Sequence, residues 1–368
     1  MLEQTISSST MEVSKMITYL TKAYVALIKN KVPLKKFPSV MLWGPPGVGK
    51  SQGVRQVAKE IEERTGKKVY VTDVRLLLFN PVDLRGIPTA NAEKTLAVWL
   101  KPQIFQMNPS EDIVNILFLD EISAAPQSVQ AAAYQITLDR TIGEHKLPEN
   151  CIVIAAGNRI TDKSVAYQMP KALANRLCHL EIKGQAESWH DWAVTSGIHE
   201  MVLGFIDCNP EMLMQFDATE KELAFATPRS WEMVSNILNY ISDNLSEVFP
   251  LIIGCVGEVA AYEFRVWTKL YNQIPDVKHI FEGKPTGIPT RPEIMYATTS
   301  QIVSRAIVHH SEEEMENVIL YANRLSLEFK SRIFNDLLKI KEIRKYLYQN
   351  EIYHAWFIRA GYDWDDYL

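Results

Sequence analysis

The sequence contains no long apolar run. No stretch reaches the roughly 18 consecutive apolar residues that a membrane-spanning helix needs. The opening segment, MLEQTISSSTMEVSKM, also lacks a basic start followed by an apolar stretch, which is the pattern of a secretory signal. Both absences argue against a membrane or exported protein, and we expect this chain in the cytoplasm.

Cysteine is scarce and scattered. Four cysteines occur in 368 residues, and no two of them form a CxxC pair. A zinc knuckle needs clustered thiols, and a secreted disulfide framework needs a closely spaced set. The sequence disfavours both kinds of site. The thiols are typical of buried cysteines in a reducing compartment: Cys151, Cys178, Cys208 and Cys255.

Strong charge of either sign is also missing. Lys and Arg number 39 against 44 Asp and Glu, which gives a formal net charge of −5. No overall basic field therefore draws the chain onto nucleic acid or an anionic membrane, although a local basic patch stays open. With 47% hydrophobic residues, the chain can build more than one core without disulfides, so we expect a multidomain protein.

Apolar periodicity divides the chain into an α/β part and an all-α part. Residues 13–29 have helical spacing, and Pro33 and Pro38 follow in a linker. From about residue 39 to 183, strand-like runs alternate with helical patterns, which predicts a parallel sheet with crossover helices. After Glu181 only helical patterns follow. The strand-like runs are VMLW at 40–43, VYVTDV at 69–74, ILFLD at 116–120 and CIVIAAGN at 151–158.

The stretch GPPGVGKS follows the first of these runs and precedes a helical pattern. Its spacing fits a phosphate-binding loop, in which backbone N–H groups wrap the phosphates, the lysine reaches the β and γ oxygens, and the serine ligates Mg²⁺. Chance gives such a spacing in on the order of one per cent of chains of this length. Its place between a strand and a helix argues further against an ordinary surface loop. We therefore expect ATP and Mg²⁺ here, held by Gly44, Pro45, Pro46, Gly47, Val48, Gly49, Lys50, Ser51 and Gln52.

A second element of the expected site is the apolar run that ends in Asp120 and Glu121. An apolar strand ending in two carboxylates is the arrangement called Walker B. Asp120 is expected to hold Mg²⁺, directly or through water, and Glu121 to orient and deprotonate the attacking water. An acidic pair that caps the following helix is the structural alternative.

A third strand-like run ends in Gly157, Asn158 and Arg159. It places an amide at the carboxyl edge of the predicted sheet, where ligands of open α/β folds collect. Asn158 is therefore a candidate to hold the water or the γ-phosphate. Taken alone, Gly-Asn is also common chemistry for a turn at the end of a strand.

Six segments carry a resemblance to a known family: LWGPPGVGKS, NPVDLRGIP at 80–88, ILFLDEISAAPQSVQAAAYQI, VIAAGNR, MPKALANRL at 169–177 and ATPRSWEMV at 226–234. In this order they resemble the AAA+ ATPases, and within them the MoxR-type group, over roughly residues 37–250. The resemblance implies an α/β core with a parallel sheet flanked by helices, an all-α lid and an α-helical C-terminal extension. The expected bounds are 1–36 for an N-terminal helix and linker, 37–186 for the nucleotide-binding domain, 187–250 for the lid and 251–368 for the extension.

The resemblance also implies roles for single residues. Asn158 matches the sensor 1 residue, Arg176 the arginine finger that a neighbouring subunit points into the nucleotide site, and Arg229 the sensor 2 arginine of the lid. A guanidinium suits such roles because it stabilises the charge spread over a transferring phosphoryl group. Each arginine, taken singly, is equally well explained as a surface or ion-pair residue.

Two further segments resemble parts of the same family. Residues 140–148 are similar to the hairpin before sensor 1, and residues 83–88 to the start of the MoxR-type insertion, parts that commonly face the pore or the substrate. Arg140 and Arg159 are candidates for a seam between subunits. Surface loops without a role are the alternative for both segments.

The resemblance implies an ATP hydrolase that assembles into a homo-oligomeric ring, expected to be a hexamer. Our first hypothesis is a remodeller that uses ATP hydrolysis to mature or activate a partner protein, with a von Willebrand factor A domain protein as a candidate companion. One alternative is the motor of a restriction-like or DNA-remodelling complex, which would need a basic channel interleaved with aromatics. Another is a chelatase-type motor subunit that serves the insertion of a metal into a macrocycle.

The aromatic residues of the last third of the chain leave two interpretations open. They are candidates for a partner-binding surface, but aromatics at helical spacing are more typical of a core. The residues concerned are Trp267, Tyr271, Trp356 and Trp364.

Overall fold

The computed structural model describes residues 10–159, 169, 174–215, 223–242 and 244–364. The chain divides into two compact units, the first ending at Gly184 and the second beginning at Gln185. Each unit has a hydrophobic core of its own. None of the described helices is both long enough and apolar enough to cross a membrane.

The first unit is built on a sheet of six strands in the order β1-β10-β2-β9-β6-β3. Every neighbouring pair in this sheet is parallel. The carboxyl ends of the strands therefore share one edge, and the predicted α/β class is confirmed. The strands are β1 (Thr10–Glu12), β2 (Val40–Trp43), β3 (Lys68–Arg75), β6 (Ile113–Asp120), β9 (Cys151–Gly157) and β10 (Cys178–Lys183).

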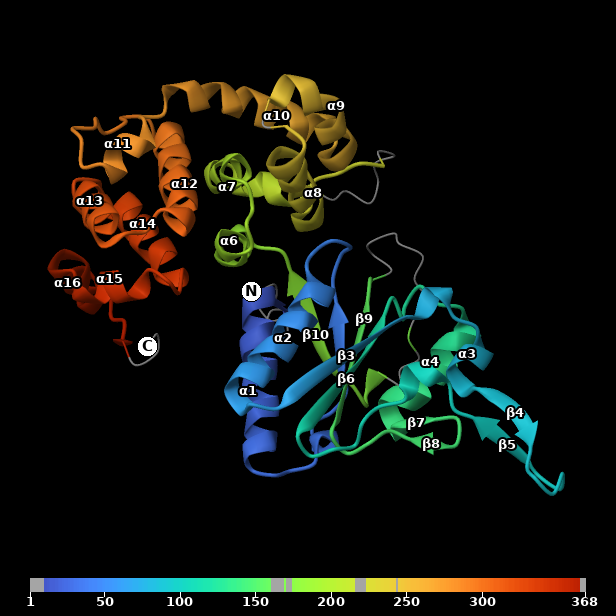
Figure 1. The fold of residues 1–368 in the computed structure, drawn as a ribbon. Helices are drawn as coiled ribbons and strands as arrows, with labels where there is room; N and C mark the ends of the chain where they lie inside the picture. The colour runs from blue at the N-terminus through green and yellow to red at the C-terminus, as the bar shows by residue number, and fades with distance from the viewer. Residues whose placement is uncertain (1–9, 160–168, 170–173, 216–222, 243, 365–368) are drawn as a thin grey trace, which may run out of the picture. The chain divides into compact units, whose positions relative to one another are not determined.

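Helices cover both faces of this sheet, which explains why its central strands are almost continuously apolar. Met41 and Val153 are buried in one cluster with residues of α4 (Gln127–Asp139). Alternate strand residues point to the opposite face, where α1 (Val13–Lys29) and α2 (Lys50–Thr65) contact the strands (Figure 1). Full burial of each aliphatic side chain stabilises such a core by roughly 1.5–3 kcal/mol.

Helices α1 and α2 approach each other closely at Gly53. A Cβ at this position would lie 2.5 Å from Cε of Met16 and 3.1 Å from Cγ1 of Val13. A side chain at this position would therefore displace the end of Met16 and press against Val13. Helix α1 therefore supports the first turns of α2, the helix that begins at Lys50.

Two antiparallel hairpins accompany the sheet, and Figure 1 shows both beside α3 and α4. The imidazole of His145 connects them, because its Nε2 lies 2.9 Å from the carbonyl oxygen of Trp99. The remaining elements of this unit are short: β4 (Ile87–Ala90), β5 (Ala97–Leu100), β7 (Thr141–Ile142), β8 (His145–Lys146), α3 (Pro81–Arg85), and the 3-10 turns η1 (Leu34–Lys36), η2 (Leu76–Leu78) and η3 (Gln103–Phe105).

The second unit is helical throughout its described residues. One hydrophobic cluster runs from Trp189 to Phe357, and several helices begin with side-chain caps, such as the box between Ser311 and Glu314. The all-α region predicted after the sheet is confirmed. Its helices are α6 (Ala186–Thr195), α7 (Glu200–Cys208), α8 (Pro228–Tyr240), α9 (Leu245–Val256), α10 (Glu258–Thr268), α11 (Val277–Phe281), α12 (Pro292–Val308), α13 (Glu312–Asn323), α14 (Leu327–Lys339), α15 (Arg344–Gln349) and α16 (Glu351–Arg359), with the 3-10 turns η5 (Pro210–Leu213) and η6 (Lys269–Gln273).

The aromatic residues of the last third of the chain lie mainly in this core. Trp267 and Trp356 are buried, and the indole of Trp364 stacks on the ring of Phe357 with centroids 4.0 Å apart. The side chain of Tyr271 lies outside the described residues. The core interpretation therefore holds for Trp267 and Trp356.

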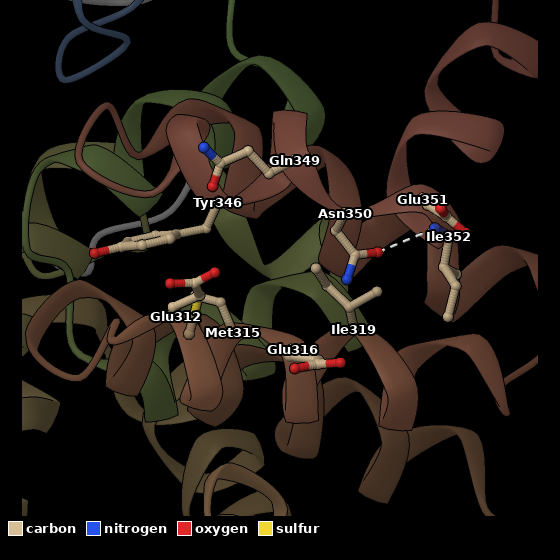
Figure 2. Close-up of a pocket in the computed structure, with 9 residues that line it drawn as sticks. All are labelled: Glu312, Met315, Glu316, Ile319, Tyr346, Gln349, Asn350, Glu351 and Ile352. Atoms are coloured by element: carbon tan, nitrogen blue, oxygen red, sulfur yellow. Dashed lines mark hydrogen bonds between the residues drawn. The ribbon is translucent and has the colours of Figure 1, made fainter.

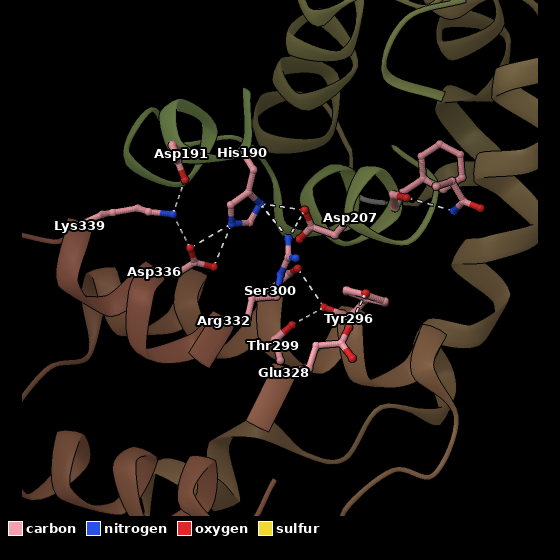
Figure 3. A network of polar contacts seen from close by, with 12 residues as sticks. His190, Asp191, Asp207, Tyr296, Thr299, Ser300, Glu328, Arg332, Asp336 and Lys339 are labelled. Carbon is pink, nitrogen blue, oxygen red and sulfur yellow. Dashed lines mark hydrogen bonds and ion pairs between the residues drawn. The ribbon is translucent and has the colours of Figure 1, made fainter. Parts of the chain in front are cut away.

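A buried ionic network joins helices α6 and α7 to α14. His190 lies between two aspartates, with Nδ1 2.8 Å from Oδ1 of Asp207 and Nε2 2.9 Å from Oδ2 of Asp336 (Figure 3). Arg332 also pairs with Asp207, and Nζ of Lys339 lies 2.6 Å from Oδ1 of Asp336. Nearly complete burial makes such charges costly unless each one is paired.

Burial by itself lowers the pKa of His190, but the charges and hydrogen bonds of Asp336 and Asp207 outweigh it and raise this pKa to about 9. Burial raises the pKa of Asp336, but the charges and hydrogen bonds of His190 and Lys339 outweigh it and lower this pKa to about 2. Lys339 also pairs with Asp191 at 2.6 Å. With His190 protonated, three cations face three carboxylates.

The pH dependence of unfolding tests this network. Because the pKa of His190 is raised on folding, its contribution is fully present below about pH 6.5 and is lost as the pH rises through about 9. The contribution of Asp336 is present above about pH 4 and is lost as the pH falls towards about 2. We expect denaturant unfolding to show a loss of about 3 kcal/mol between about pH 6 and about pH 9.5.

A matched pair of histidine variants separates this network from the rest of the chain. His190→Gln should remove most of the alkaline loss, whereas His279→Gln should keep it, because His279 is half-exposed beside Asp276. An unchanged alkaline loss in His190→Gln would contradict the assignment.

Candidate functional site

The ends of three adjacent strands bring the sequence-predicted residues together. Strands β2 and β9 pair so that Trp43 lies opposite Gly157, and β9 pairs with β6, which ends at Asp120. The segments that follow these strands therefore leave the sheet side by side at its carboxyl edge, where open α/β folds bind ligands.

The loop after β2 has the backbone conformation that its glycines permit. Gly47 and Gly49 have φ angles of +78° and +102°, which side chains with a Cβ rarely adopt. At Gly44, a Cβ would lie 2.6 Å from the carbonyl oxygen of Ile182 on β10. Helix α2 begins directly afterwards, so its first N–H groups and the positive end of its dipole face this loop. The remaining predicted loop residues are Pro45 and Pro46, both partly buried, Val48, which is buried, and Gln52, which is exposed on α2.

Lys50 is buried at the centre of this arrangement. Its Nζ donates to the carbonyl oxygens of Gly44 at 2.6 Å and Pro45 at 3.0 Å, and to Oδ1 of Asn158 at 3.0 Å. The lysine thus connects the loop after β2 with the segment after β9. A buried ammonium among carbonyl and amide oxygens is a strong attractor for an anionic group such as a phosphate.

Ser51 and Asp120 meet across the same edge. The hydroxyl of Ser51 donates to Oδ2 of Asp120 at 2.9 Å. Mg²⁺ prefers oxygen ligands and commonly takes one or two from protein, with phosphates and water completing its shell. A hydroxyl and a carboxylate at this distance fit such an ion.

Glu121 follows Asp120 with a left-handed backbone, at a φ of +57°. Its N–H donates to Oδ1 of Asp120 at 2.9 Å, and the residue is exposed. Non-glycine residues rarely take this conformation, and such positions are frequent at functional sites. Glu121 is thus exposed directly after the strand, while Asp120 is its last residue.

Asn158 is held by a residue that the sequence did not single out. Its backbone N–H donates to Oγ of Ser123 at 2.9 Å, and Ser123 is buried. Gly157 precedes Asn158 and is buried as well. A serine two positions after a carboxylate carries no signal of its own, because its partner is 35 residues away along the chain.

The two arginines with implied roles belong to other elements of the chain. Arg176 is exposed just before β10, and Arg229 is exposed in the first turn of α8, in the second unit. Within the part of the chain that the structure describes, neither guanidinium has a hydrogen bond or an ion pair. Within the first unit the structure therefore brings together Lys50, Ser51 and the residues after β6 and β9, but not Arg176.

The two arginines considered for a subunit seam have partners within the chain. A guanidinium nitrogen of Arg140 donates to the carbonyl oxygen of Cys151 at 2.6 Å, and burial lowers the pKa of this arginine. Arg159 pairs with Glu181 at 2.9 Å. Arg140 thus has a structural role between α4 and β9.

A pocket of about 340 Å³ lies in the second unit, between α13 and the α15–α16 turn (Figure 2). Met315 and Ile319 are its buried apolar residues, and three carboxylates also line it. Such carboxylates repel a nucleotide triphosphate at neutral pH. The chemistry of this pocket is therefore unlike that of the site around Lys50. The carboxylates belong to Glu312, Glu316 and Glu351.

Residues 40–179 match the model of a protein family described as "ATPase family associated with various cellular activities (AAA)". The matched segment contains the loop after β2, Asp120, Glu121, Asn158 and Arg176. The match covers less than half of the chain, and over this segment it supports the resemblance to AAA+ ATPases.

Solved structures give weaker similarities. PCH-2 from C. elegans is 12% identical, with 81% of this chain and 70% of that chain covered and a TM-score of 0.34. Hsp104 in a closed state is 17% identical, with 67% and 47% covered and a TM-score of 0.42, so this chain spans about half of its length. A RuvB mutant from Thermotoga maritima is 14% identical, with 83% and 86% covered and a TM-score of 0.33. Similarity at this level defines no substrate or assembly for this chain, and a search of curated proteins finds no match.

Proposed function

We propose that this chain is a MoxR-type AAA+ ATPase that hydrolyses ATP with Mg²⁺, works as a homo-oligomeric ring and remodels a partner protein. The observation that carries the nucleotide part is the meeting of three strand ends. There Nζ of Lys50 lies 3.0 Å from Oδ1 of Asn158, and Oγ of Ser51 lies 2.9 Å from Oδ2 of Asp120. A cation, a pair of oxygen ligands and an amide in one place are the parts that phosphoryl transfer needs.

Each of these residues has a proposed role in hydrolysis. The backbone of residues 44–49 and the start of α2 bind the phosphates, and Lys50 exchanges its carbonyl partners for β and γ oxygens. Ser51 and Asp120 would hold Mg²⁺, which would supply charge neutralisation at the phosphates. Glu121 accepts the proton of the attacking water, and Asn158 orients that water or the γ-phosphate.

The sheet register supports a role for Arg176 in a neighbouring subunit. Cys178 pairs with Val40 at the start of both strands, and Arg176 precedes Cys178 by two residues. Arg176 therefore lies near the amino edge of the sheet, about 10 Å of strand away from the edge that holds the phosphate loop. Because Arg176 lies at the amino edge, it is poorly placed for the nucleotide site of its own subunit and better placed for the site of a neighbouring subunit. Repetition of such a head-to-tail contact between subunits closes a ring.

The lid and the partner complete the proposal. Arg229 is exposed in the second unit, as a residue that senses nucleotide from a lid would need to be. The net charge of −5 favours a protein client over nucleic acid, with a von Willebrand factor A domain protein as the candidate companion. A nucleic-acid motor remains the alternative, and binding that weakens steeply with salt would favour it.

The first test is ATP turnover. The purified chain should release phosphate from ATP with Mg²⁺ and lose this activity in EDTA, and Lys50→Ala should lower turnover by on the order of 10²–10³-fold because the buried cation is gone. Lys59→Ala is a matched control on the same helix, since its side chain is 76% exposed. Equal turnover by Lys50→Ala and the wild type would refute the nucleotide site.

A further inference from the structure

Ser123 lies between the two polar segments of the site. It belongs to the turn that follows Glu121, and it is 3% exposed. Its hydroxyl accepts the backbone N–H of Asn158 at 2.9 Å. Through this hydrogen bond to Asn158, the side chain of Ser123 connects the turn after β6 with the segment after β9.

Gly157 permits this close approach. A Cβ at Gly157 would lie 2.7 Å from Oγ and 3.0 Å from Cβ of Ser123, and 2.9 Å from Cε of Met41. A side chain there would force the side chain of Ser123 to move and would disturb its contact with Asn158. The backbone of Gly157 and the hydroxyl of Ser123 therefore fix the spacing between these segments together.

The turn that holds Ser123 is itself well anchored. The N–H of Ile122 donates to the carbonyl oxygen of Ala156 at 3.0 Å. On the other side, Nε2 of Gln130 on α4 donates to the carbonyl oxygens of Ser123 at 3.2 Å and Ala125 at 2.9 Å. The buried hydroxyl of Tyr134 donates to Oε1 of Gln130 at 3.2 Å. Ser123 is thus a fixed point from which Asn158 can be held.

We propose that Ser123 is a positioning residue that sets the place of Asn158 relative to Glu121. This inference rests on the proposed function, in which Glu121 and Asn158 act on the same water or γ-phosphate. Their effect depends on both groups being within hydrogen-bond distance of that target at once. Loss of the hydroxyl frees the N–H of Asn158 and loosens this spacing, while the phosphate loop and Lys50 stay in place.

The test separates kcat from KM. In Ser123→Ala, kcat for ATP should fall about 10–100-fold, because a misplacement of about 1 Å at a reacting centre costs up to about 10²-fold. The KM for ATP should stay within about twofold, because the loop after β2 provides most of the nucleotide binding.

Ser39→Ala is the matched control. Ser39 is 4% exposed, and its hydroxyl donates to the carbonyl oxygen of Thr137 at 2.6 Å, at the start of β2 and away from the carboxyl edge. Ser39→Ala loses a hydroxyl oxygen from a place as buried as that of Ser123. The midpoint of thermal unfolding should therefore shift by a similar amount in Ser39→Ala and Ser123→Ala. The kcat of Ser39→Ala should stay within about twofold of the wild type.

Three outcomes would overturn the positioning role: an unchanged kcat in Ser123→Ala, a rise in KM that accounts for the whole loss, or an equal loss of kcat in Ser39→Ala. The last two would mean that Ser123 contributes binding or packing alone. The proposed function fails separately, if the wild-type chain does not hydrolyse ATP at all. If the wild-type chain hydrolyses ATP and Ser123→Ala has the same kcat, the proposed ATPase function stands and only the positioning role of Ser123 is refuted.

Discussion

Replacing Glu121 by Gln should abolish ATP turnover and leave ATP bound. Glutamine keeps the shape of the side chain but cannot accept the proton of the attacking water, and loss of a general base costs about 10²–10⁴-fold in rate. Lys50, Ser51 and Asp120 remain, so nucleotide binding should be within a few-fold of the wild type. Phosphate release and equilibrium binding of ATP measure the two effects separately.

Glu63→Gln is the control for this variant, because Glu63 is 63% exposed on α2 and pairs only loosely with Lys59 at 3.9 Å. It should turn over ATP like the wild type. Turnover by Glu121→Gln near the wild-type rate would show that Glu121 is not the base.

The Glu121→Gln variant is also suited to capture a partner protein, because it should hold ATP without hydrolysing it. Identification of the proteins that co-purify with this variant in the presence of ATP tests the remodelling proposal.

Replacing Arg176 by Ala should remove hydrolysis even though ATP still binds. An arginine that stabilises the transition state from a neighbouring subunit is worth about 10³–10⁵-fold in rate. The decisive measurement is a mixture of Arg176→Ala and Glu121→Gln subunits. Where an Arg176→Ala subunit keeps its own Glu121 and receives Arg176 from a Glu121→Gln neighbour, an intact site forms, and activity should return in part.

The absence of any recovery in this mixture would count against a shared site. Arg64→Ala controls for loss of an exposed arginine, since its guanidinium pairs with Glu60 on the same helix at 3.1 Å. Its turnover should match that of the wild type.

The sequence predicts the buried central strands well, because both of their faces are covered and their apolar residues run together. Strand β2 has the predicted bounds, and β3, β6 and β9 differ at their ends by one to three residues. The edge of the sheet formed by β1 and β10 was not predicted. In β10, CHLEIK alternates polar and apolar residues and is half-buried, and β1 has three residues that gain strand structure only by pairing with β10.

Part of the site could also be predicted, because its residues follow the clearly apolar central strands. Lys50, Ser51, Asp120 and Asn158 follow strands that the sequence marks clearly, so the parallel topology alone brings them to one edge. Ser123 and the bare backbone of Gly157 act through one short contact between distant segments. Such a contact depends on packing distances of a few tenths of an ångström, which a spacing pattern does not contain.

The ionic network in the second unit has a mechanical consequence. Sliding α7 along α14 by one residue would separate Asp207 from Arg332 and His190 and leave buried charges without counter-charges, at a cost of about 3–5 kcal/mol for each broken pair. Helices packed by apolar contacts alone can slide past each other by small amounts and keep most of their contacts. Specific ion pairs are lost by such a movement, so no intermediate position of the helices keeps them. We therefore expect helices α6, α7 and α14 to move together as one rigid group when a force acts on any of them.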